Sequence, residues 1–161
     1  MDQKEVQSQT LAFIQELLFK KKLPESSLLL IMDQLDSFFK VLPKDSIQTV
    51  VNFLYCLSNL SCTTVKLYFI RTEIMKRLFD LVNTSKQVQE RAEALRCICN
   101  FTHGLEIIPT EESEDRTLLI DILNSKEMCS ALSWGLDGKI GAKVNLLSLE
   151  ALDNILSFLA R

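Results

Sequence analysis

A repeat with a period of 41 residues is the feature that most constrains the fold of this chain. Three segments align without gaps: VQSQTLAFIQELLF from Val6, IQTVVNFLYCLSNL from Ile47 and VQERAEALRCICNF from Val88. A fourth segment, AKVNLLSLEALDNI from Ala142, fits the same frame 54 rather than 41 residues further on. Self-similarity at a fixed period is typical of solenoids and other repeat architectures.

Each segment has apolar residues three or four positions apart, which predicts a helix. We expect long helices near 5–19, 45–61, 86–103 and 140–159. Shorter amphipathic segments lie between them at 24–42, at 63–83 with a break near Thr72, and at 116–137 with a break near Asn124. The apolar stripes expected to be buried are Ile47, Val51, Leu54, Leu57 and Leu60, then Val88, Ala92, Leu95, Ile98 and Phe101, then Leu146, Leu149, Leu152 and Ile155.

The repeating unit is therefore a short helix, a second short helix and a long helix. Armadillo and HEAT repeats have periods of about 40–47 residues, and a unit of three helices favours armadillo. We predict an all-α, right-handed armadillo solenoid of about three such repeats, preceded by an N-terminal leftover helix. The predicted single domain, residues 1–161, divides into a partial repeat at 1–22, repeats at 23–62 and 63–104, a solvated acidic loop at 105–115 and a repeat at 116–161. Four Gly and three Pro are too few for a turn-rich β fold.

Composition narrows the function classes and the compartment. A net charge of −3 argues against a nucleic-acid-binding surface. No apolar run approaches the ~20 residues of a membrane span, so we expect no membrane partner. Five Cys, an odd number, together with a polar start and no signal-peptide core, predict a reduced protein of the cytoplasm or nucleus.

The cysteines favour packing over chemistry. Cys56, Cys97 and Ala151 occupy one position of the repeat frame, which indicates a shared buried site for small side chains. Cys97 and Cys99 followed by His103 could suggest a metal site. However, residues two apart on a helix point in nearly opposite directions, and zinc sites usually have longer spacings and four ligands. We therefore expect no metal and no cofactor. His103 is expected at a helix end beside a Gly104 cap.

A polar stripe runs along the long helices. It consists of the positions 11, 7, 4 and 0 residues before an Asn that recurs in three copies. Asn is a mediocre helix former, so its recurrence is not a propensity effect. An amide donates and accepts hydrogen bonds and so suits an extended peptide backbone; an exposed face inherited from a common ancestral repeat is the alternative. The stripe contains Gln48, Asn52, Tyr55 and Asn59, then Gln89, Glu93, Arg96 and Asn100, then Lys143, Leu147, Glu150 and Asn154.

The strings SNLS, CNFTHG and LEALDNIL at the ends of these helices resemble the C-terminal repeats of the importin-α (karyopherin-α) branch of armadillo proteins. In that family a Trp and, four residues later, an Asn line a concave groove that binds nuclear localisation signals. The resemblance places the groove Asn at Asn59, Asn100 and Asn154. The positions of the Trp hold Tyr55, Arg96 and Glu150 instead, and the family's basic importin-β-binding segment is not visible.

The resemblance implies a non-enzymatic protein- or peptide-binding scaffold with a role in nuclear protein import. An armadillo or HEAT-type adaptor unrelated to transport is the alternative, and a compact helical bundle with an accidental period is a further one. We do not expect an enzyme, because one His and four Gly leave little catalytic material and no catalytic motif occurs.

Overall fold

The computed structural model of the chain describes residues 3–20, 24, 26–32, 47–60, 62–108 and 113–161. The elements in these ranges are all helices, so the predicted all-α class is confirmed. Contacts divide the chain into two compact units, Met1–Leu57 and Ser58–Arg161. The single domain and the repeat boundaries stay predictions.

The first unit contains two of the four predicted long helices. These are α1 (Gln3–Phe19) and α3 (Ile47–Ser58), and residues 26–32 form a further helical stretch. Residues 33–42 of the helical segment predicted at 24–42 lie outside the described residues. The buried apolar side chains of the first unit include Leu28, Met32, Val51, Leu54 and Leu57. The last three belong to the stripe predicted on α3.

The second unit consists of two consecutive groups of three helices. The first group is α4 (Thr63–Arg71), α5 (Ile74–Thr84) and α6 (Val88–Thr102). After the short 3-10 helix η2 (Leu105–Ile107) come α7 (Glu114–Leu123), α8 (Lys126–Leu136) and α9 (Ala142–Leu159). The short helices of each group are separated at Thr72 and Asn124, as predicted.

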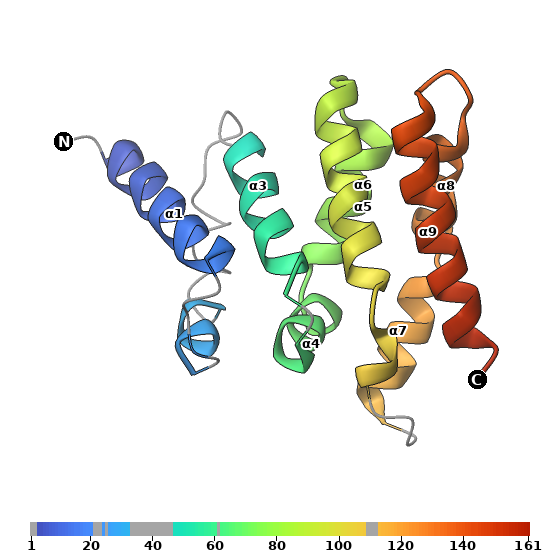
Figure 1. The fold of residues 1–161 in the computed structure, drawn as a ribbon, viewed down its shortest axis with the longest axis horizontal. Coiled ribbons are helices and arrows are strands. Elements are labelled where there is room, and N and C mark those ends of the chain that lie inside the picture. The colour runs from blue at the N-terminus through green and yellow to red at the C-terminus, as the bar shows by residue number, and fades with distance from the viewer. Residues whose placement is uncertain (1–2, 21–23, 25, 33–46, 61, 109–112) are drawn as a thin grey trace. The chain divides into compact units, whose positions relative to one another are not determined.

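Corresponding helices of the two groups pack against each other. Helix α4 contacts α7, α5 contacts α8, and α6 contacts α9 (Figure 1). Within each group the second short helix also packs on the long one, α5 on α6 and α8 on α9. The second group therefore repeats the helix order of the first and the packing of its second short helix on its long helix, and the two long helices lie side by side.

The core of the second unit is built around α6. The rings of Phe69 and Phe101 stack with their centroids 5.8 Å apart. Leu95, Ile98 and Cys97 on the same helix are fully buried. The positions predicted to be buried by the repeat frame are confirmed, because Cys97 and Ala151 are 0% exposed and Cys56, in the first unit, is 7% exposed.

The apolar stripe predicted for α9 is wrong at two of its positions. Leu146 and Leu149 are 58% and 52% exposed, and Val88, predicted to be buried on α6, is 55% exposed. The face of α9 that meets its neighbours instead carries Ser148, Ala151, Ile155 and Phe158. The small side chains of Ser148 and Ala151 allow close contact between the helices. The bulkier leucines lie on a side of α9 that no described element covers.

The solvated loop predicted at 105–115 is also wrong in part. Leu105 and Ile108 are 2% and 0% exposed, so the start of this segment belongs to the core. At its end the Ser113 hydroxyl accepts a hydrogen bond from the backbone N–H of Arg116 and caps α7. Asp115 accepts two hydrogen bonds from the Arg71 guanidinium, at 2.7 and 2.8 Å, and this lowers the pKa of its carboxyl. Residues 109–112 lie outside the described part.

Ser148 gives a stability prediction. Its side chain is 0% exposed, and its hydroxyl makes no hydrogen bond to any residue that the structure describes. A buried hydroxyl without a partner costs about 1–3 kcal/mol. We expect Ser148→Ala to be neutral or to stabilise the fold by up to about 1 kcal/mol in urea denaturation, whereas a clear loss of stability would indicate a hydrogen bond at this position.

Candidate functional site

Two of the aligned Asn side chains are hydrogen-bonded to each other. Asn100, in the last turn of α6, donates from Nδ2 to Oδ1 of Asn59 over 3.1 Å. The same Nδ2 donates to the hydroxyl of Ser58 over 3.2 Å. The expectation that these two amides occupy neighbouring positions on one surface is confirmed. Because both bonds use Nδ2, the donors of Asn100 are satisfied within the protein.

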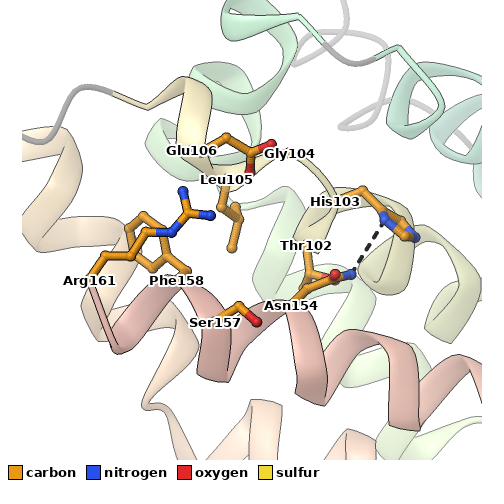
Figure 2. A pocket seen from close by; sticks show the side chains of 9 residues that line it. All are labelled: Thr102, His103, Gly104, Leu105, Glu106, Asn154, Ser157, Phe158 and Arg161. Atoms are coloured by element: carbon orange, nitrogen blue, oxygen red, sulfur yellow. Dashed lines mark hydrogen bonds between the residues drawn. The ribbon is translucent and has the colours of Figure 1, made fainter.

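The third aligned amide bonds to the end of α6. Asn154 on α9 donates from Nδ2 to Oγ1 of Thr102 over 3.1 Å and lies 3.5 Å from Nδ1 of His103 (Figure 2). Thr102 in turn donates to the backbone carbonyl of Cys99 over 2.7 Å. Because that bond uses the hydroxyl proton of Thr102, its oxygen is an acceptor for Asn154. His103 follows the last residue of α6 beside Gly104 with φ +65°, as predicted.

The other predicted stripe residues divide between the two units. In the second unit Gln89 donates to Glu93 over 3.3 Å, and Arg96 and Glu150 are exposed. Asn52 and Tyr55 belong to the first unit, where each is partly buried. The side chain of Gln48 lies outside the described part of the structure. Within the second unit, the structure thus brings Asn59 and Asn100 together and places Asn154 beside His103.

A polar hollow, which the sequence did not indicate, adjoins Asn154. It has a volume of about 250 Å³ and lies between the end of α6, η2 and the end of α9. Figure 2 shows His103 and Asn154 on one side of it and Arg161 with Phe158 on the other. Its lining offers hydroxyl, amide, imidazole, carboxylate and guanidinium groups from Thr102, His103, Glu106, Asn154, Ser157 and Arg161.

A second group of side chains lies on the same edge of α6 and α9. Cys99, His103 and Glu150 each bring one potential metal-ligating atom to within 4.8 Å of the others. The Cys99 thiol donates to Oε2 of Glu150 over 3.7 Å. Burial and, to a smaller extent, the neighbouring Glu150 carboxylate together raise the pKa of this thiol to about 12. The sequence argument against a metal concerned Cys97, Cys99 and His103, whereas this group has Glu150 from a different helix in place of Cys97.

The end of α6 is held by a buried lysine. Lys66 on α4 is 2% exposed, and its Nζ donates to the backbone carbonyl of Phe101 over 2.6 Å. Carbonyl groups in the last turn of a helix have no partner within the helix. Lys66 therefore satisfies the carbonyl of Phe101, which lies between Asn100 and His103 in the sequence. This hydrogen bond fixes the backbone that carries both side chains. In the sequence, the single Lys within the apolar pattern of residues 63–70 is the feature that could have indicated this buried contact.

No protein-family model matches the chain, and no curated protein or solved structure shows significant similarity to it. None of the described helices is both long and apolar enough to cross a lipid bilayer.

Proposed function

We propose that this chain is a non-enzymatic scaffold that binds an extended peptide segment along the edge formed by Asn59, Asn100 and Asn154. The observation that carries the proposal is the hydrogen bond between Asn100 and Asn59, which aligns two amides from successive repeats. In the described residues the Nδ2 of Asn59 and the Oδ1 of Asn100 have no further partner. The pair thus offers one donor and one acceptor, which are the groups that a peptide C=O and N–H require.

The spacing of the helices supports an extended ligand. Packed helices lie about 8–10 Å apart, and an extended chain advances at most about 3.3–3.6 Å per residue. Asn100 and Asn154, on the adjacent long helices α6 and α9, would therefore meet positions two or three residues apart in a peptide. Asn59 and Asn100, joined by a hydrogen bond of 3.1 Å, would contact neighbouring peptide groups. The Oδ1 of Asn154 on α9 adds the next acceptor along the edge, because its Nδ2 is occupied by Thr102.

We further propose that the helices form a right-handed armadillo solenoid. The pairing of α4 with α7, α5 with α8 and α6 with α9 supports this proposal, since stacked repeats bring corresponding helices together. The resemblance of SNLS and CNFTHG to importin-α repeats extends it to nuclear protein import, in the cytoplasm and nucleus. An armadillo or HEAT-type adaptor outside transport is the second candidate, and Arg96 favours it because an exposed guanidinium would repel a Lys-rich signal.

The two Asn residues provide the test of peptide binding. The peptide is the tightest binder from a random-sequence array. We expect Asn59→Ala and Asn100→Ala each to reduce its binding free energy by about 0.5–1.5 kcal/mol, as measured by titration. Asn100→Ala also removes an interhelical bond and should lower stability by a similar amount, without unfolding the protein.

Asn83→Ala is the matched control for that experiment. Asn83 donates to the backbone of Glu127 over 3.3 Å, so its loss removes an interhelical hydrogen bond elsewhere in the unit. It should reduce stability and leave peptide affinity unchanged. Unchanged affinity in both Asn59→Ala and Asn100→Ala would mean that the aligned amides only join the helices.

Arg96→Trp separates the two candidate functions. On the import proposal, it should increase affinity for a Lys-rich peptide, because an aromatic ring replaces a repelling charge. On the adaptor alternative, the parent already prefers neutral or acidic peptides, and the substitution should not create Lys-rich binding.

A further inference from the structure

We propose that Cys99, His103 and Glu150 form a zinc-binding site on the edge between α6 and α9. The inference concerns this group of side chains alone and is independent of peptide binding. It replaces the sequence-based expectation of no metal, which considered Cys97, Cys99 and His103 but not Glu150.

The positions of the three residues follow from the helices that carry them. Cys99 lies in the last turn of α6, and His103 directly follows the last residue of that helix, so both lie at the same helix end. Glu150 belongs to α9, which packs against α6. The three potential ligand atoms lie within 4.8 Å of one another. Two helices thus contribute three different ligand types to one point.

The distances suit a tetrahedral zinc ion. With Zn–S of about 2.3 Å and Zn–O of about 2.0–2.2 Å, tetrahedral sulfur and oxygen ligands lie about 3.5–3.7 Å apart. The Sγ of Cys99 and Oε2 of Glu150 are 3.7 Å apart. The exposed His103 and Glu150 side chains are free to move by the remaining few tenths of an ångström to an ångström. Little rearrangement of the backbone is required.

The chemistry of the ligand set favours Zn²⁺ over harder cations. A thiolate and an imidazole are ligands for zinc, whereas Mg²⁺ and Ca²⁺ prefer oxygen alone. The thiol is protonated without metal, so binding releases its proton to solvent and the ion takes the place of the hydrogen bond to Glu150. Three protein ligands leave a fourth position for water, because His103 and Glu150 lie at the surface.

Cobalt substitution tests the site on the full chain under reducing conditions. We expect one Co²⁺ per chain, with thiolate-to-cobalt charge-transfer absorption and the strong visible bands of tetrahedral Co²⁺, and displacement of Co²⁺ by Zn²⁺. Because the chain has one His, Zn²⁺ should also shift a single set of imidazole NMR signals. No charge-transfer absorption, or no imidazole shift, overturns the proposal.

Variants assign the ligands. Cys99→Ala should abolish the charge-transfer absorption, and Glu150→Gln and His103→Asn should each weaken binding beyond the ~10–100-fold effect of losing an outer-shell partner. Cys129→Ser removes an exposed thiol and Cys97→Ala a buried one; both should bind as the parent does. Absorption that survives Cys99→Ala, or that disappears in Cys129→Ser, overturns the assignment. If circular dichroism shows that Cys99→Ala does not fold, the exposed Glu150→Gln variant decides, and unchanged affinity in it refutes the site.

Discussion

Replacing Gly135 with alanine is expected to destabilise the second unit by about 3 kcal/mol, the upper part of the usual range for an overpacked core. A Cβ atom at this position on α8 would lie 2.0 Å from Oγ of Ser148 and 2.6 Å from Cδ2 of Leu95. Both neighbours are fully buried, on α9 and α6. Relief of these clashes would require either shifts of buried side chains in the packed core or separation of the helices. Alanine's higher helix propensity would offset at most about 1 kcal/mol of this cost.

Urea denaturation of three variants measures this effect. Gly138→Ala is the matched control, because a Cβ there meets no atom within 4 Å, and it should change stability by no more than about 0.5 kcal/mol. Adding Ser148→Gly to Gly135→Ala removes the hydroxyl contact but leaves the contact with Leu95, so we expect partial rescue. If Gly135→Ala is as stable as the parent, α8 does not approach α6 and α9 as closely as described here.

The positions of the helices could be predicted because they depend on local periodicity. The spacing between Ile47 and Val88 fixed the frame, and the breaks at Thr72 and Asn124 followed from the loss of the apolar pattern. The same frame placed Asn59 and Asn100 on one surface, and the hydrogen bond between them confirms it. Local pattern and repeat register are therefore sufficient to find the helices and part of the candidate site.

The rotation of each helix about its axis could not be predicted in the same way. On α9 both the leucines at 146 and 149 and the smaller residues at 148 and 151 form plausible faces, and the close approach of Gly135 selects the smaller ones. That rotation also turns Glu150 towards Cys99, 51 positions away in the sequence. The contribution of Glu150 to the potential metal ligands and the hollow beside Asn154 depend on this packing, so no spacing in the sequence indicated them.

Lys66 makes the stability of the protein depend on pH in the alkaline range. Burial lowers the pKa of its amine to about 8 from the ordinary 10.5, although the charges of Glu106 and Cys62 favour the ammonium. Its Nζ also lies 5.4 Å from the centre of the Phe101 ring. Below the folded pKa the amine is protonated in both states, and the folded chain bears the full cost of a buried charge. Between the two pKa values the unfolded chain binds more protons, so stability rises with pH.

Between pH 8 and pH 10.5, we expect the unfolding free energy of the parent, relative to that of Lys66→Met, to rise by about 3 kcal/mol. Near neutral pH the two should differ little, because methionine removes the buried charge but leaves the Phe101 carbonyl without its donor, at a cost of about 1–3 kcal/mol. At high pH the neutral amine still donates to that carbonyl, and the parent should be clearly more stable.

The difference between the two proteins is the informative quantity, because Cys99 acts in the opposite direction. Its pKa rises from 9.0 to about 12 on folding, so the folded chain retains a proton that the unfolded chain loses, and stability falls above pH 9. This contribution is common to the parent and Lys66→Met and cancels on subtraction. Denaturation should be done with a reductant and a chelator, so that neither disulfides nor metal alter the thiol. A difference that stays constant from neutral pH to pH 10.5 would show that Lys66 remains charged in the folded protein, held by Glu106 rather than neutralised by burial.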